Sequence, residues 1–204
     1  ALLASDNLPK TKAEAAGALM ATADGQPEAQ NMIAKTGSVR QLVLLLSEQD
    51  SHAQQMAAGA IAAISSGSPA VRDAVEKEAG VKKLVGLLYA RYGDPVRAEA
   101  AKALAVLSGG HRENQTEIAR ADGIQLLVEM LGVNRTDNAK EAAAAALWAL
   151  SASHHDNQSA IASAGGVERL VTMLAGGSGR AQRQATGALV ALALDNGDNE
   201  ASIA

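Results

Sequence analysis

NQTEIARADGIQLLVEMLGVNRTDNAKEAAAAALWALS, residues 114–151, is the stretch that decides the fold. Its apolar pattern over residues 124–131 returns three more times along the chain, beginning at Val39, Val81 and Val167. The copies are spaced by 42 or 43 residues. Self-similarity at a fixed period of this length indicates an array of repeats, in which each unit packs against its neighbours.

Each repeat contains three segments with helical periodicity, separated by helix breakers. The first is short and is expected over residues 29–35, 71–78, 114–121 and 157–164 and from residue 199. The second carries the apolar pattern above. The third is about four turns long, with columns of alanine and leucine at helical spacing. A glycine follows each first segment, at Gly37, Gly80, Gly123 and Gly165, and we expect it to take the left-handed conformation that turns the chain.

These segments divide the chain into a single array. The array comprises a partial repeat over residues 1–24, then repeats over 25–66, 67–109, 110–152 and 153–195, and the start of a further repeat over 196–204. Both ends fall inside a repeat, so we expect the chain to be a fragment of a longer protein. Residue spacing alone predicts no more than a stacked helical array.

Composition excludes several kinds of site. Cysteine is absent, so neither disulfides nor thiolate metal ligands exist. A net charge of −4 gives no strong attraction to nucleic acid, and with aromatic residues at 1% there is no platform for base stacking. The longest apolar runs are too short to span a bilayer.

The repeated pattern NQxxIAxxGGVxxLVxML, followed by AxxALxxLA, resembles that of the armadillo repeat family over the whole chain. The resemblance implies an all-α fold, a right-handed α-solenoid of three-helix repeats. It also implies that the third helices line a concave groove, which holds partner peptides, helices or domains.

If the third helices line a groove, Trp148 marks its exposed column. Importin-α, a member of this family, repeats W-x-x-x-N on these helices, whereas here Trp148 stands alone and Ala152 occupies the asparagine position. A β-catenin-like groove would be strongly basic, and few cations fall in this one. Trp148 either contacts a partner or tucks into the seam between repeats. The candidate groove residues are Met20, Ser66, Lys102, Trp148, Ala152, Arg183 and Val190.

A second candidate surface is an edge column of positive charge. Lys35, Lys77 and Arg120 occupy equivalent positions, and Lys82 and Lys83 lie nearby at the start of a second helix. The column is interpreted as a solvated helix face, or alternatively as a docking strip for an acidic partner or lipid headgroups.

No sequence pattern predicts catalysis. We expect no enzymatic activity, no bound cofactor and no metal site. His111 and His154 are repeat equivalents and are interpreted as polar loop residues. Asn114 and Asn157 formally match glycosylation acceptors but coincide with helix starts, so we interpret them as helix caps.

We therefore expect a non-enzymatic scaffold or adaptor of the cytoplasm, with the nucleus and cytoskeletal assemblies left open. It would bind other proteins through the groove or the edge, not nucleic acid. Membrane attachment is expected only through segments outside these residues. The alternatives are a structural subunit of a large axonemal or membrane-anchored assembly, and the substrate-recognition arm of a ubiquitin ligase.

Overall fold

The computed structural model describes residue 3, residues 9–194 and residues 196–203, and every regular element within them is a helix. Contacts divide the chain into two compact units, Ala1–Leu107 and Ser108–Ala204. The predicted repeat boundary at residue 195 lies outside the described residues. Among those residues, no helix is long and apolar enough to cross a membrane.

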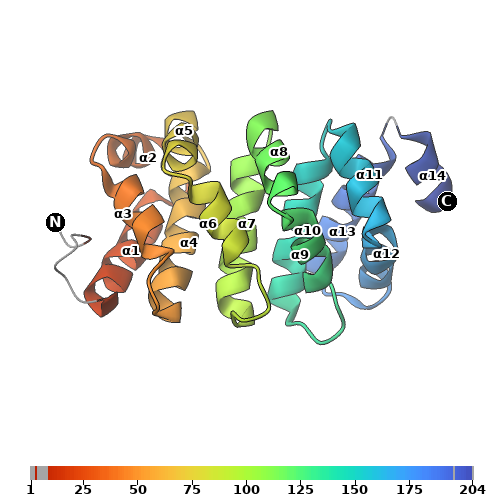
Figure 1. Ribbon diagram of the computed structural model, residues 1–204, viewed down its shortest axis with the longest axis horizontal. Coiled ribbons are helices and arrows are strands. Elements are labelled where there is room, and N and C mark those ends of the chain that lie inside the picture. The colour runs from red at the N-terminus through yellow and green to blue at the C-terminus, as the bar shows by residue number, and fades with distance from the viewer. Residues whose placement is uncertain (1–2, 4–8, 195, 204) are drawn as a thin grey trace. The chain divides into compact units, whose positions relative to one another are not determined.

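The helices follow one another in groups of three, short, short and long (Figure 1). The first unit contains α1 (Pro9–Ala23), α2 (Pro27–Ala34), α3 (Ser38–Leu45), α4 (Ser51–Ser65), α5 (Pro69–Lys77), α6 (Gly80–Gly86) and α7 (Asp94–Ser108), which ends at the boundary. The second contains α8 (Arg112–Arg120), α9 (Gly123–Met130), α10 (Asp137–Ser151), α11 (His155–Ser163), α12 (Gly166–Gly176), α13 (Gly179–Ala193) and α14 (Gly197–Ile203).

The longest helix of each group confirms the predicted period. All five are 15 residues long, and the last four begin at residues 51, 94, 137 and 179. The prediction of an all-α fold with three helices per repeat is therefore confirmed. The handedness of the solenoid and the repeat boundaries stay predictions.

The short first helices begin two residues earlier than predicted, because their caps lie further upstream. Asn114 and Asn157 are not caps but buried residues of the first turn. The caps are histidines: His111 Nδ1 accepts a hydrogen bond from the Asn114 N–H at 3.3 Å, and His154 Nδ1 accepts one from the Asn157 N–H at 3.4 Å. The side-chain amide of Asn157 donates through Nδ2 to the Leu150 carbonyl at the end of α10 (3.0 Å).

Two of the four glycines between first and second helices take the predicted left-handed conformation, and the two in the middle repeats do not. Gly37 and Gly165 are left-handed, with φ of 71° and 78°, but in the two middle repeats Ala79 and Asp122 take that conformation. Gly123 follows Asp122, and a Cβ on it would stand 2.7 Å from the Ile118 carbonyl oxygen. The middle glycines are therefore required by close approach of the backbone, not by φ.

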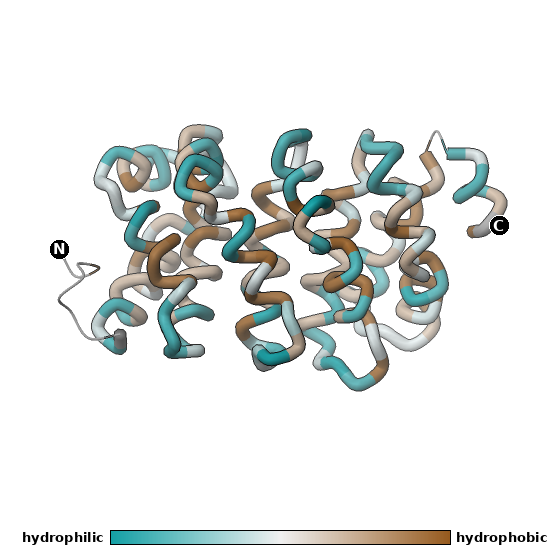
Figure 2. Tube along the Cα trace, viewed as in Figure 1, coloured by the Kyte–Doolittle hydropathy of each residue, from teal (hydrophilic) through white to brown (hydrophobic). Residues whose placement is uncertain are grey.

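The alanine and leucine columns of the third helices form the core of each unit. In the second unit α10 packs along α13, and its Ala143, Ala146, Leu147 and Leu150 are fully buried. In the first unit α1 packs along α4 in the same way. Alanine lets the helix axes approach closely, and each buried leucine contributes roughly 1.5–3 kcal/mol. Figure 2 shows hydrophobic residues along the helix bodies and hydrophilic residues at many of the turns.

Buried glutamines of the first helices join neighbouring third helices. Gln158 of α11 donates through Nε2 to the carbonyls of Ser151 at the end of α10 (3.3 Å) and Ala191 near the end of α13 (2.9 Å). Gln30 of α2 likewise donates through Nε2 to the carbonyls of Ala23 at the end of α1 and Ala63 near the end of α4, each at 2.9 Å. Each glutamine satisfies carbonyls that a helix end leaves without an internal partner.

Two residues of the last copy of the apolar pattern depart from their predicted burial, and Leu174 of α12 is one of them, since it is only half-buried. Val171 of α12 is 45% exposed, whereas its equivalents Val43, Val85 and Val128 are buried. Val43 is covered by the next repeat, since its Cγ2 lies against Gly80 at the start of α6. No second helix follows α14 within the described residues to cover Val171 in this way.

Candidate functional site

Trp148 lies on α10 with its indole ring against Gly187 of α13. A Cβ built on Gly187 would stand 2.7–2.8 Å from the ring atoms Cδ2, Cε3 and Cε2, a separation that real side chains do not adopt. The ring nevertheless remains 42% exposed. It therefore packs on the next long helix while keeping a surface free for contact.

The same arrangement recurs in the first unit. Met20 of α1 is the repeat equivalent of Trp148, and its Sδ would be 2.9 Å from a Cβ on Gly59 of α4. Gly59 and Gly187 are themselves equivalent. The glycine of one long helix thus makes room for the larger side chain of the helix before it.

Three large exposed apolar side chains lie on α10, on α13 and at the C-cap of α13. Val190 lies three residues after Gly187 and shares the helix face on which Trp148 rests, and Leu194, four residues further on, is the C-cap. Val190 is 63% exposed and Leu194 is 58% exposed. We call Trp148, Val190 and Leu194 the apolar patch. Two of the other predicted groove residues are small: Ser66 is exposed, and Ala152 is half-buried at the end of α10.

The charged groups on these helices are mostly paired. Lys102 of α7 donates to Glu99 Oε1 at 2.9 Å. Arg180 Nε of α13 lies 3.7 Å from Glu141 Oε1 of α10. Arg183, four residues before Gly187, is exposed and makes no ion pair among the described residues.

Several solved structures are similar to this chain. An engineered protein is 36% identical, with a TM-score of 0.87 over 94% of this chain and 76% of its own. A second engineered protein is 32% identical and has a TM-score of 0.90, and the match covers 99% of this chain and 82% of that protein. A designed armadillo repeat protein, 23% identical, has a TM-score of 0.88 over 99% and 84%. Another, in complex with the peptide (KR)4, has 23% identity and a TM-score of 0.87 over 99% and 83%.

The chain has an armadillo-like repeat fold. Neither a protein-family model nor a curated protein matches its sequence. The shared fold identifies the apolar patch as lying on the third helices of armadillo-like repeats, where the sequence analysis placed the groove.

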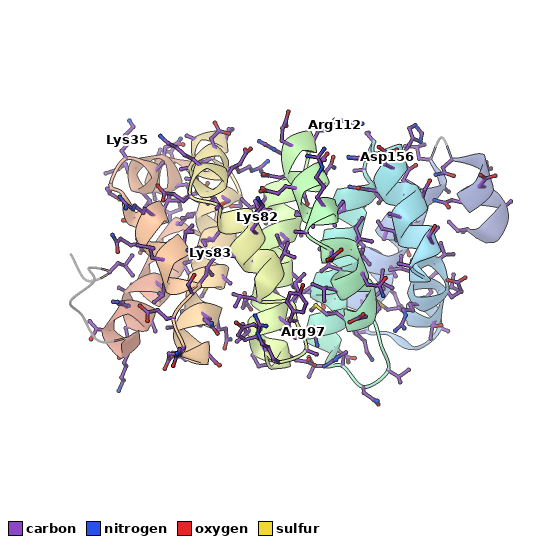
Figure 3. The ribbon with its side chains drawn as sticks, in the orientation of Figure 1. Lys35, Lys82, Lys83, Arg97, Arg112 and Asp156 are labelled. Atoms are coloured by element: carbon purple, nitrogen blue, oxygen red, sulfur yellow. The ribbon has the colours of Figure 1, made fainter. Side chains whose placement is uncertain are left out.

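The edge column of positive charge is not assembled into one cluster in the first unit. Figure 3 shows Lys35 near the end of α2, apart from Lys82 and Lys83 on α6. Lys83 Nζ donates to the Val43 carbonyl at 3.2 Å, so its charge is partly used inside the unit. Lys77 is exposed and lies between Glu76 and Glu78 in the sequence, and Arg120 of the second unit is also exposed.

The histidines of this armadillo-like chain have a structural role that sequence reasoning missed. His154 is only 4% exposed. Its Nδ1 accepts from the Asn157 N–H, and its Nε2 lies 3.2 Å from Thr116 Oγ1, which itself donates to the Arg112 carbonyl at 3.0 Å. These bonds assign the proton to Nε2 and leave Nδ1 the acceptor.

Burial lowers the pKa of His154, and the nearby positive charge of Arg112 lowers it further, while Asp156 opposes the shift. The neutral ring is therefore the form that fits the cap. A repeat alignment carried the signal for this role, because the helix-capping residues Ser68, His111, His154 and Asn196 occupy one column. In the described part of the chain, no three His, Cys, Asp or Glu side chains are grouped to hold a metal ion.

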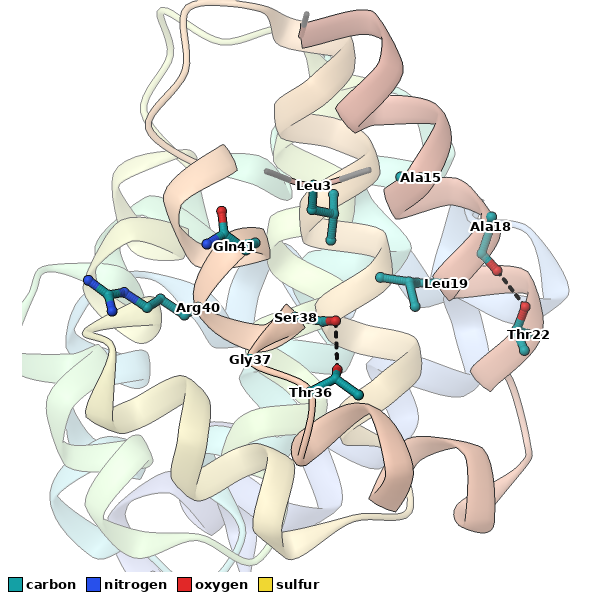
Figure 4. Close-up of a pocket in the computed structure, with 10 residues that line it drawn as sticks. All are labelled: Leu3, Ala15, Ala18, Leu19, Thr22, Thr36, Gly37, Ser38, Arg40 and Gln41. Atoms are coloured by element: carbon teal, nitrogen blue, oxygen red, sulfur yellow. Dashed lines mark hydrogen bonds between the residues drawn. The ribbon is translucent and has the colours of Figure 1, made fainter. Parts of the chain in front are cut away.

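A pocket of the first unit lies between α1 and α3 and has a volume of about 670 Å³ (Figure 4). Its apolar wall includes Ala18, which is exposed, and Leu19, which is half-buried. The hydroxyls at its rim are already satisfied: Thr22 Oγ1 donates to the Ala18 carbonyl, and Thr36 and Ser38 share a bond, each at 2.7 Å. The cavity therefore offers apolar contact and little polar recognition.

Proposed function

We propose that this chain is a non-enzymatic binding module that holds an extended segment of another protein against its third helices. The observation that carries the proposal is the position of Trp148. Gly187 supports one side of the indole ring and 42% of the residue stays exposed. Tryptophan is the side chain most enriched among residues that dominate binding energy.

Two physical features favour this face. A ring already held in place loses little conformational freedom on binding, so less of the contact energy is spent on ordering it. The small residues around it, such as Ala145, Ala152 and Gly187, leave room for the backbone of a bound segment to approach. The edge column is a less favourable binding surface, because Lys35 lies apart from Lys82 and Lys83 and because Lys83 donates a hydrogen bond to the Val43 carbonyl.

The structural neighbours support the same proposal. One designed armadillo repeat protein was solved in complex with a peptide, and another was designed for modular peptide recognition. We extend peptide recognition, but not the neighbour's peptide sequence, to this chain.

Selection from a displayed random peptide library tests the proposal. Peptides selected on the wild-type chain should bind the Trp148→Ala variant more weakly by about 2 kcal/mol or more, as expected for a central tryptophan. Val171→Ala is the matched control, since Val171 has similar exposure but lies on α12, and its affinity should be unchanged. Equal affinities for wild type and Trp148→Ala, with unchanged helicity, would contradict binding at this face.

A further inference from the structure

The apolar patch ends beside a cation on the same helix face. Arg183, Gly187 and Val190 follow one another along α13 at intervals of three or four residues, so they form one stripe, and Leu194 is the C-cap residue that ends the helix four residues after Val190. Trp148 rests on the glycine in the middle of that stripe. The stripe therefore presents a positive charge at one end and exposed aliphatic and aromatic surface toward the other.

The charges around the stripe favour an anionic group. Glu141, the acidic residue of α10 that faces α13, is already within 3.7 Å of Arg180. Lys140 of α10 and Arg183 of α13 are the cations of these two helices with no ion pair in the described structure, and Lys140 instead lines a pocket with residues of α12. A carboxylate brought to Arg183 would gain a charge-assisted hydrogen bond, whereas a lysine or arginine side chain would meet like charge.

The apolar patch offers a cationic ligand only one aromatic ring. The residue equivalent to Trp148 in the next repeat is Val190, so no second ring is available to enclose a cation between two aromatic faces. Val190 and Leu194 instead extend the indole surface with aliphatic groups, which suit an aliphatic side chain.

We propose that the apolar patch and Arg183 together select peptide segments in which an aliphatic residue lies about three positions from an acidic one. Arg183 and Val190 are seven residues apart on α13, which is about 10 Å along the helix. An extended chain covers that distance in about three residues. This inference rests on the proposed function and specifies the class of segment that the face accepts.

The test uses Trp148 as its own reporter, since it is the one tryptophan in the chain. The probe is a serine-rich peptide carrying Asp and Leu three positions apart. The comparison peptides replace Asp with Lys, replace Leu with Ser, or are (KR)4. Titration with the Asp–Leu peptide should give a saturable blue shift of Trp148 emission as the ring becomes buried. Each comparison peptide should bind at least tenfold more weakly.

Charge reversal on the protein makes the test specific. Arg183→Glu should weaken binding of the Asp–Leu peptide at least tenfold. It should strengthen binding of the comparison peptide in which Lys replaces Asp, the Lys–Leu peptide. The control Arg120→Glu changes the net charge equally from an exposed site on α8 and should alter neither affinity. Arg183 is exposed, so circular dichroism should show an unchanged fold.

The outcomes separate this inference from the proposed function. If Lys–Leu or (KR)4 binds the wild-type chain as tightly as Asp–Leu and shifts Trp148 emission, the inference is overturned while peptide binding at this face stands. Reversal at Arg183 that leaves the preference unchanged also overturns it. If no defined peptide shifts the emission, the inference is wrong, and library selection against Trp148→Ala decides the proposed function by itself.

Discussion

Glycine at the start of the second helices shows how one residue type fills two roles at adjacent positions. Gly165 has the left-handed φ that glycine tolerates, while Gly166 beside it would place a Cβ 2.7 Å from the Ile161 carbonyl oxygen. In the middle repeats the left-handed residue is Ala79 or Asp122, and only the close-approach glycine is retained. In these repeats the backbone crossing therefore requires glycine, whereas in the repeat of α2 and α3 the left-handed position is Gly37 and Ser38 follows it.

Gly123→Ala should accordingly destabilise the second unit by about 1–3 kcal/mol, the usual cost of forcing a group into a filled site. The added methyl would stand 2.5 Å from Ile118 Cγ2 and 2.7 Å from a backbone oxygen that cannot move freely. Urea denaturation measures the change. Gly176→Ala is the control, because nothing lies within 4 Å of a Cβ there, and it should be neutral or slightly stabilising.

Helix α11 depends on polar contacts at its N-terminus more than on length. It has only nine residues, and the neutral His154 ring caps it while Gln158 joins it to α10 and α13. The cap requires an unprotonated Nδ1, since a protonated Nδ1 would direct its hydrogen at the Asn157 N–H. A short helix in this position is therefore sensitive to pH.

Stability of the second unit should fall as pH decreases below about 6.5, the ordinary pKa of histidine. The folded-state pKa of His154 is lowered, so the unfolded chain binds a proton first and is stabilised by acid. The contribution is fully present above pH 6.5 and is lost as pH falls toward the lowered pKa. We expect the loss to reach about 1 kcal/mol, the value of a helix cap.

Urea unfolding at pH 7.5 and pH 5.5 measures this dependence for the wild type and for His154→Asn, which keeps a capping side chain like that of Asn196. The variant should lose the His154 part of the pH dependence. His52→Asn, at an exposed position of α4, should retain it. A pH dependence that is equal in wild type and His154→Asn would show that the cap does not titrate in this range.

At the scale of the whole molecule, stability is distributed among neighbouring helices. Within each unit the long helices pack in sequence-adjacent pairs, α1 with α4 and α10 with α13. Repeat proteins of this kind are stabilised by each repeat and by its interfaces with the next one. Damage to one long helix should therefore spread to its neighbours before it affects distant helices.

Leu147→Asp should remove hydrogen-exchange protection from α10 to α13 while α1 to α4 stay protected. Leu147 is fully buried, and an uncompensated carboxylate there loses its hydration in addition to the leucine contacts. Hydrogen exchange with mass spectrometry resolves these helices. Thr172→Asp places the same charge at an exposed site of α12 and should leave protection unchanged. Equal loss in α1–α4 would contradict the nearest-neighbour picture.

The sequence by itself determined the period, the three helices of each repeat and the buried columns. Helix formation and burial follow from apolar spacing within one repeat, and residues such as Leu127 and Leu147 carry that pattern locally. The same spacing marked Trp148 as the residue that stands out on the third helices.

Only the tertiary structure decided how these residues are used. Three contacts depend on three-dimensional distances: His154 caps α11, Gly123 lies close to the backbone of Ile118, and Trp148 rests on Gly187. Trp148 and Gly187 lie about one repeat apart in the chain. Periodicity places a side chain on a helix face, but it does not fix which atom of a neighbouring helix that side chain meets. For this reason the fold was predictable in its elements, whereas the geometry of the candidate site was not.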